Sequence, residues 1–218
     1  MYSFVFTFGR EFAIMESGNH TYDLELWGSF RAGDEKALER LFGSYYAVLL
    51  NYGHKFTLNS YLIEESVQDL FVRLWNNRSS IGSTNNVKHY LFKAYRHILF
   101  RKLRKQAANV MEKLDDERYD FRIELAPDQE MIKEENDAEL RLTIEKGLAA
   151  LTSRQREAIY LRFYEDLSYE EVSEILNLNI GGTYKLIYRA LDGLRDVLGS
   201  AVLAVLLTGL RLHSIILI

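Results

Sequence analysis

Apolar residues recur every three or four positions along most of the chain between residues 23 and 198, which is the period of helices that pack one face on a core. Few segments show the strict alternation of a half-buried strand, and the sequence contains a single proline. The pattern therefore predicts an all-α fold. Helices are expected over residues 24–30, 34–56, 60–77, 87–105, 137–148, 152–167, 168–176 and 180–194.

Polar residues mark the start of several of these helices. Ser60 can cap the helix over residues 60–77. Thr152 with Gln155, and Ser168 with Glu171, have the three-residue spacing of a capping box, in which the two side chains each accept a backbone N–H of the other's residue. Two successive helices are therefore expected from residue 152 onward.

A turn at Asn177-Leu178-Asn179 separates the last two predicted helices. On the second of them, Lys185 and Arg189 lie one turn apart on the face away from the apolar stripe. A short helix, a turn and a longer helix with exposed cations suit insertion into a DNA major groove. A helical hairpin with merely solvated cations is the more common explanation of such an isolated pair, because the signature is degenerate, so the rest of the chain has to decide.

The charge distribution adds information that the net charge of −4 hides. Between residues 88 and 105 there are seven basic residues and no acidic one, with Tyr90, Phe92, Tyr95 and Phe100 among them. Cations neutralise phosphates and aromatic rings stack on exposed bases, so this helix is a candidate for nucleic-acid binding. An amphipathic core helix with a solvated basic face is the alternative.

Residues 106–140 reverse that charge, with twelve acidic residues against four basic ones and little apolar periodicity. We expect an acidic linker over residues 106–138 between two domains, 22–105 and 139–198. The apolar tail, residues 199–218, is interrupted by Arg211 and His213, so we expect it to pack on a domain or a partner rather than to cross a membrane. Residues 1–21 fit poorly with the rest and are expected to be an extension, with Met15 a candidate start of translation.

Residue types with catalytic potential do not form a recognisable site in the sequence. The five histidines lack metal-ligand spacing, the adjacent glutamate pairs point different ways around their helices, and Gly181-Gly182 lacks the pattern of a phosphate-binding loop. The chain contains no cysteine, which excludes disulfides and thiolate metal sites. We therefore expect no enzyme, no metal and no cofactor.

Two groups of motifs resemble one known family. LTSRQREAIYLRFYEDLSYEEVSEIL (151–176) with IYRAL (187–191) resembles the promoter-binding carboxy-terminal domain of bacterial sigma factors. EESVQDLFVRLW (64–75) with HYLFKAYRHILFRKLRK (89–105) is similar to their conserved amino-terminal domain. The order and the short interval match the extracytoplasmic-function (ECF) group of the sigma-70 family over residues 23–198. The resemblance implies two small helical domains, sigma region 2 over residues 22–105 and sigma region 4, a helix-turn-helix, over residues 139–198.

The same resemblance assigns roles to individual positions. It implies contact with core RNA polymerase by Glu65, Gln68, Asp69, Phe71 and Trp75. It implies capture of a flipped base of the minus-ten element by the segment 77–86. It implies contact with melted minus-ten DNA by Lys88, Tyr90, Lys93, Arg96, His97 and Arg101, and with the minus-thirty-five element by Thr183, Lys185 and Arg189.

The resemblance further implies a cytoplasmic initiation factor that has core RNA polymerase and promoter DNA as partners, takes no small-molecule substrate, and is held by an anti-sigma factor, often a membrane-bound one. His97, Asn177 and Gly181-Gly182 depart from the family pattern, and two glycines at a helix start predict weak base recognition there. Two other functions stay open at this point: a stand-alone helix-turn-helix regulator that does not bind polymerase, and a helical scaffold tethered to a membrane by its tail.

Overall fold

The computed structural model describes residues 20–108, 119–123 and 135–216. These residues form helices and connecting turns without any strand, so the predicted all-α fold is confirmed for the described part of the chain. The chain divides at residue 117 into two compact units, each described here by itself. The predicted extension, including Met15, lies outside the described residues up to residue 19, and the first helix already begins at His20.

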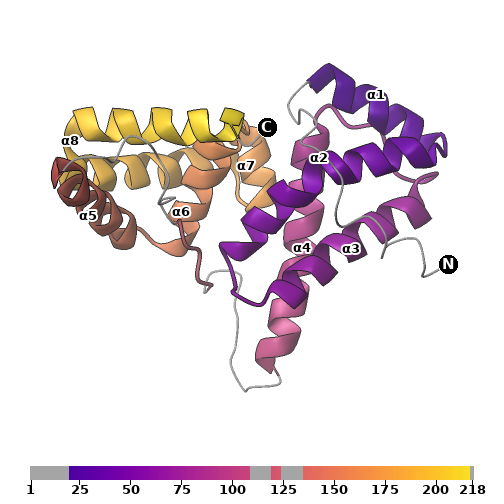
Figure 1. The fold of residues 1–218 in the computed structure, drawn as a ribbon, viewed down its shortest axis with the longest axis horizontal. Helices are drawn as coiled ribbons and strands as arrows, with labels where there is room; N and C mark the ends of the chain where they lie inside the picture. Colours follow the sequence, from indigo (N-terminus) through magenta and orange to yellow (C-terminus); the bar gives the residue numbers. More distant parts are fainter. Residues whose placement is uncertain (1–19, 109–118, 124–134, 217–218) are drawn as a thin grey trace. The chain divides into compact units, whose positions relative to one another are not determined.

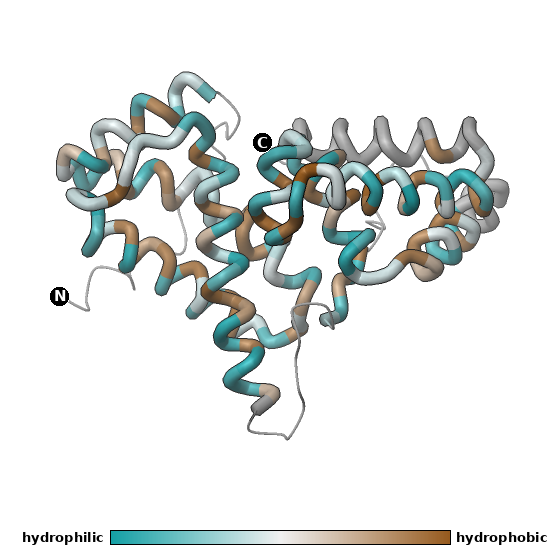
Figure 2. Tube along the Cα trace, turned by 180° about the vertical axis from the view of Figure 1, so that it is seen from behind, coloured by the Kyte–Doolittle hydropathy of each residue, from teal (hydrophilic) through white to brown (hydrophobic). Residues whose placement is uncertain are grey.

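The first unit is a bundle of four helices, α1 (His20–Arg31), α2 (Glu35–His54), α3 (Ser60–Asn77) and α4 (Val87–Ala108). Each helix packs on the next, and α4 also contacts α1 and α2, which closes the bundle (Figure 1). Apolar positions recur at intervals along each of these helices (Figure 2). Aromatic rings fill the centre, where the Tyr52 ring lies 4.9 Å from Phe92 and 5.0 Å from Phe56, between centroids.

Polar side chains cap the starts of α2 and α3, and one of these caps differs from the prediction. Asp34 caps α2 by accepting the Lys36 N–H at 2.9 Å. The predicted cap of α3, Ser60, is wrong. Asn59 is the capping residue, and its side-chain oxygen accepts the Leu62 N–H at 3.1 Å, so Ser60 becomes the first residue of the helix.

The second unit contains α5 (Glu135–Ala150), α6 (Ser153–Ile159), the π-helical turn η1 (Tyr160–Tyr164), α7 (Tyr169–Ile175) and α8 (Ile180–Ile216). Both predicted capping boxes are present, at Thr152 and at Ser168. The helix expected over residues 152–167 is instead α6 followed by η1, in which the Glu165 N–H donates to the Tyr160 carbonyl at 3.0 Å. Periodicity alone does not distinguish one wide turn from continued α-helix.

The backbone of α8 breaks at Gly199, which has φ 71° and ψ 162°, a conformation that favours glycine. Beyond this break the chain turns back and runs beside the earlier part of α8 (Figure 1). Leu203 is buried there. The tail therefore packs on its own unit, as expected for part of the apolar segment. Among the described residues, no helix combines the length and the apolarity that crossing a membrane requires.

The acidic segment differs from a simple linker. Helix α4 runs on to Ala108, and α5 begins at Glu135, before the predicted domain start at residue 139. Between them, residues 119–123 belong to the second unit, where the Phe121 side chain is completely buried. The rest of the predicted linker lies outside the described residues.

Candidate nucleic-acid and polymerase interfaces

The second unit contains a helix-turn-helix formed by α7 and α8. Asn177 adopts φ 52° in the turn, and the Leu178 N–H donates to the Ser173 carbonyl at 2.8 Å. Asn179 caps α8 by accepting the Gly182 N–H at 2.7 Å. A Cβ at Gly182 would lie 3.2 Å from the Asn179 side-chain oxygen, which is tighter than most real contacts. The side chain of Asn179 thus offsets the weak helix initiation expected at Gly181-Gly182.

The exposed face of α8 contains Lys185 and Arg189, as predicted, and also Tyr184 and Tyr188. The opposite face is buried and includes Ile187, Ala190 and Leu194. Thr183 lies on this buried face, and its hydroxyl donates to the Asn179 carbonyl at 3.3 Å. The predicted DNA contact by Thr183 is therefore corrected: its side chain is not presented to a ligand.

An aromatic stack supports the exposed face. The rings of Tyr169 (α7) and Tyr184 (α8) are stacked, with centroids 4.3 Å apart and an angle of 21° between the rings. The Arg162 guanidinium lies 5.3 Å from the Tyr169 ring centre. Neither exposed tyrosine was among the predicted DNA-binding residues, although their four-residue spacing beside two cations was a usable signal.

On α4 the predicted DNA-binding residues divide into two groups. Lys93, His97 and Arg101 are exposed and lie at four-residue intervals along one row of the helix. Tyr90 is half-buried, with its ring centroid 4.9 Å from that of Trp27, and burial raises its pKa. Lys88 is also half-buried, and its ammonium lies 5.9 Å from the Phe92 ring centre.

The predicted DNA contact by Arg96 is also corrected. Its side chain is buried, and the guanidinium lies 4.1 Å from the ring centre of Phe100, one turn further along α4. This cation–π contact makes Arg96 part of the packing inside the bundle rather than part of the exposed row. The four-residue spacing of Arg96 and Phe100 was visible in the sequence, but it did not show which of the basic residues points inward.

The loop between α3 and α4 is held against α1. The Arg31 Nε–H donates to the Ile81 carbonyl at 2.7 Å, and the Trp27 indole N–H donates to the Gly82 carbonyl at 3.3 Å. Asn86 ends the loop by accepting the His89 N–H at 3.1 Å, one turn into α4. These contacts position the polar segment 77–86 at the beginning of the basic helix.

The predicted polymerase-binding residues lie on α3. Glu65 is exposed, and Gln68, Asp69 and Trp75 are half-buried. The predicted polymerase contact by Phe71 is corrected, because its ring is buried and meets the Phe42 ring edge-on, with centroids 5.0 Å apart. The other four residues remain available at the surface.

The two acidic residues of this surface share one cation from the basic helix. The Lys102 ammonium lies 2.7 Å from the Glu65 carboxylate and 3.0 Å from the Asp69 carboxylate. The Lys102 side chain is 16% exposed, compared with 48% and 40% for its partners. The ion pairs fix two carboxylates of α3 relative to α4, although their exposure limits what each contributes to stability.

The comparisons with known proteins agree on one family. A family model described as "Sigma-70, region 4" matches residues 141–192. The RNA polymerase sigma factor YlaC of Bacillus subtilis (strain 168) is 25% identical over 160 residues, which cover 71% of this chain and 87% of YlaC. The ECF RNA polymerase sigma factor SigL of Mycobacterium tuberculosis (strain CDC 1551 / Oshkosh) is 28% identical over 167 residues, or 75% of this chain and 90% of SigL.

Two solved structures have a similar fold. One is the sigma factor RpoE in complex with the anti-sigma factor NepR from Bartonella quintana, with a TM-score of 0.55 and 24% identity over 76% of this chain and 98% of that one. The other is CnrH in complex with the cytosolic domain of CnrY, with a TM-score of 0.53 and 20% identity over 81% and 96%.

Proposed function

Since the chain belongs to the sigma-70 family, in its extracytoplasmic-function group, we propose that it is a transcription initiation factor that binds core RNA polymerase, directs it to specific promoters and assists DNA melting. The observation that carries the proposal is the helix-turn-helix of the second unit. Its outer helix, α8, presents Lys185 and Arg189 to solvent within the part of the chain that the region 4 model matches.

In this proposal α8 enters the major groove of the minus-thirty-five element. The exposed cations are complementary to the DNA backbone and to base edges in the groove. The N-terminal turn of α8 is completed by the Asn179 cap and carries no bulky side chain at Gly181 or Gly182, so the backbone of this turn can approach the duplex closely.

In this proposal the first unit binds core polymerase and holds the melted DNA. The exposed row of Lys93, His97 and Arg101 on α4 would bind the melted minus-ten strand, because cations neutralise a single-stranded backbone. Half-buried Tyr90 and the loop 77–86, held by α1, would border that strand. On α3, Glu65, Gln68, Asp69 and Trp75 would bind core polymerase.

The factor acts by positioning rather than by catalysis, in the cytoplasm, where polymerase and promoter DNA meet. Its further partner in the proposal is an anti-sigma factor. The support is that proteins of similar fold, RpoE of Bartonella quintana and CnrH, have been solved in complex with the anti-sigma factor NepR and with the cytosolic domain of CnrY.

In vitro transcription tests the proposal. Purified core polymerase would be given sheared DNA from the source organism, with and without this protein. We expect new, discrete start sites that disappear with the double variant Gln68→Ala/Asp69→Ala, whose side chains lie on the proposed polymerase surface. Lys36→Ala, an exposed substitution on α2, is the control and should leave the start sites unchanged.

The two other functions predict different results. A stand-alone regulator would bind specific DNA without polymerase and would leave the start sites of core polymerase unchanged. Such a result would refute the proposal and leave the exposed row of α4 without a role. A membrane-tethered scaffold would yield neither start sites nor specific binding of DNA.

A further inference from the structure

Tyr184 and Tyr188 are unusual for a helix surface, because their large rings are 49% and 64% exposed on successive turns of α8. They lie beside Lys185 and Arg189 on the same outer face. The cations make this face complementary to duplex DNA, and the rings add apolar area that phosphate binding does not require.

The two rings are placed differently. Tyr184 is held in position by its stack on Tyr169, which in turn lies under the Arg162 guanidinium. Tyr188 follows four residues later on the same side of the helix, and it is the more exposed of the two. One further turn along this row, Asp192 carries a negative charge and pairs with Arg195 at 3.4 Å. A carboxylate repels phosphates, so the DNA-facing part of α8 ends before Asp192.

Thymine is the base that an apolar surface can recognise in the major groove. Its C5-methyl group projects there, and an aromatic or aliphatic side chain distinguishes it from the other bases by apolar contact. A neighbouring arginine or lysine binds guanine or a phosphate. The face of α8 combines both kinds of side chain.

We propose that Tyr188 recognises a thymine in the upstream promoter element by contact of its ring with the C5-methyl group, with Tyr184 fixed by Tyr169 as the adjoining apolar wall. The inference rests on the proposed function and names the base that the proposed DNA-binding face selects. It assigns the recognition to the ring of Tyr188 and not to its hydroxyl.

The experiment uses the polymerase complexed with this protein and a promoter found by the transcription assay. Each thymine of the upstream element is replaced in turn by uracil, which differs from thymine in that it lacks the methyl group. Binding of the complex and yield of transcript are measured for each duplex. At one or two positions we expect uracil to lower affinity about fourfold, the value of one buried methyl or methylene group.

Three variants assign the effect. At the sensitive position, Tyr188→Ala should bind the thymine and uracil duplexes with equal affinity, so that the ratio of the two affinities becomes one. Tyr188→Phe should keep the affinity ratio of the unchanged protein. Tyr61→Ala, which removes a 76% exposed tyrosine from the first unit, should also keep it. Circular dichroism of each variant checks that the helices are intact.

The possible failures are distinguishable. A protein that directs no start sites overturns the proposed function and this inference together. A protein that directs start sites but binds thymine and uracil alike at every position, or whose upstream element contains no thymine, overturns the inference alone. Loss of the ratio in Tyr188→Phe would assign the contact to the hydroxyl and overturn it as well.

Discussion

The ring of Phe121 stands edge-on to the ring of Tyr160, with centroids 5.6 Å apart, in the core of the second unit. Phe121 comes before the helix-turn-helix in the sequence and lies within residues 106–138, whose acidic composition predicts a linker. Its neighbour Tyr119 reinforces the attachment, since its hydroxyl donates to the buried carboxylate of Glu157. The segment 119–123 is thus a structural part of the unit that contains the proposed DNA-binding face.

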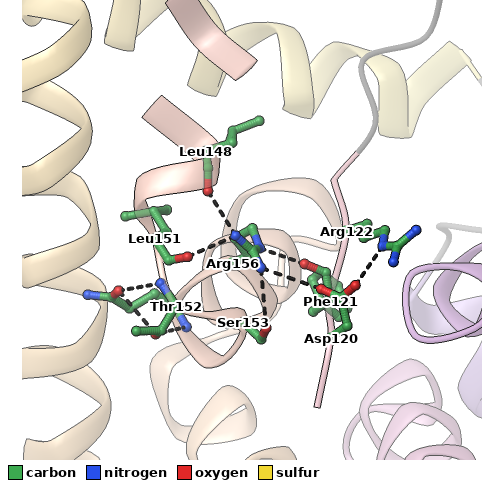
Figure 3. Close-up of polar contacts among 9 residues, drawn as sticks. Asp120, Phe121, Arg122, Leu148, Leu151, Thr152, Ser153 and Arg156 are labelled. Atoms are coloured by element: carbon green, nitrogen blue, oxygen red, sulfur yellow. Dashed lines mark hydrogen bonds and ion pairs between the residues drawn. The ribbon is translucent and has the colours of Figure 1, made fainter. Parts of the chain in front are cut away.

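Arg156 connects this segment to the rest of the unit (Figure 3). Its Nε–H donates to the Phe121 carbonyl at 2.6 Å, and one terminal nitrogen donates to the carbonyls of Leu148 and Leu151 at 3.1 and 2.8 Å. The other terminal nitrogen donates to the Ser153 hydroxyl at 3.2 Å and pairs with Asp120 at 3.6 Å. One guanidinium thereby links three parts of the chain.

Replacing Arg156 by lysine should therefore destabilise the second unit. Lysine keeps the charge but cannot reproduce the planar fork, so several carbonyls lose their donor. We expect a loss of about 2–4 kcal/mol, the order of a few charge-assisted hydrogen bonds. Residue-resolved amide hydrogen exchange measures this loss of stability, which should appear as faster exchange in α6 and η1. Arg195→Lys, at an exposed pair, is the control, and equal exchange in both variants would contradict the account.

Gly53→Ala should destabilise the first unit. A Cβ at this position would overlap the Tyr95 hydroxyl oxygen and come within 2.7 Å of a methyl carbon of Ile63, both buried. Such overpacking costs about 1–3 kcal/mol. Both tryptophans of the chain, Trp27 and Trp75, lie in this unit, so their fluorescence during urea unfolding reports its stability.

Gly28→Ala is the matched control for this measurement. A Cβ at Gly28 meets nothing within 4 Å, and the residue lies inside α1. Alanine is the better helix former by about 0.5–1 kcal/mol, so this variant should be more stable than the unchanged protein. Destabilisation of both variants alike would show that the crowding at Gly53 is not the cause.

Asp23 should make the stability of the first unit depend on pH. The side chain is buried and accepts a hydrogen bond from the Tyr45 hydroxyl at 2.5 Å, while its other oxygen is buried without a hydrogen-bond partner among the described residues. Burial raises the pKa of Asp23, although Tyr45, His20 and Lys88 each act to lower it. The folded state therefore binds the proton more tightly than the unfolded state does.

The sign follows from this raised pKa. The contribution of protonated Asp23 to the free energy of unfolding is fully present below its unfolded pKa of 3.8 and is lost as the pH rises through its folded pKa. Asn at this position stays neutral and can still accept from Tyr45. The free energy of unfolding of Asp23→Asn, relative to the unchanged protein, should therefore increase from about pH 4 upward and then level off. A constant difference in urea unfolding from pH 3.5 to 7 would contradict this.

Lys102→Met tests the shared ion pair on α3 and α4. Removing the ammonium leaves the Glu65 and Asp69 carboxylates close together without their cation. Because the Glu65 and Asp69 side chains are 48% and 40% exposed and solvent screens their charges, we expect a loss of only about 0.5–1 kcal/mol at low salt. The loss should shrink in 1 M NaCl, where the screening length falls to about 3 Å. Tryptophan fluorescence in urea measures it, and a loss independent of salt would point to packing of the lysine stem instead.

Much of the fold follows from the sequence because helix periods and capping residues act locally. The boxes at Thr152 and Ser168 depend on residues three positions apart, and both are present. Asn59, rather than Ser60, caps α3, which shows that two adjacent polar residues leave the boundary uncertain by one position. The π-helical turn after α6 has no periodic signal at all.

The candidate interfaces were predicted less completely, for a physical reason. Whether Arg96, Phe71 or Thr183 faces outward depends on neighbours from other turns or helices, such as Phe100, Phe42 and the Asn179 carbonyl. Resemblance to a family assigns a position to a surface but does not establish its exposure. The exposed tyrosines of α8 were not predicted, because Lys185 and Arg189 were identified by their charge and a tyrosine carries none.

The attachment of residues 119–123 also determines how far the chain can extend between its two units. From Ala108 to Tyr119 the backbone can reach at most about 40 Å, even when fully extended. The whole backbone from Ala108 to Glu135, without an attachment at residues 119–123, could span at most about 95 Å. In the proposed function, the shorter reach limits how far apart the two promoter elements bound by one molecule can lie, and variants of Arg156 or Phe121 that release the attachment should tolerate a wider spacing.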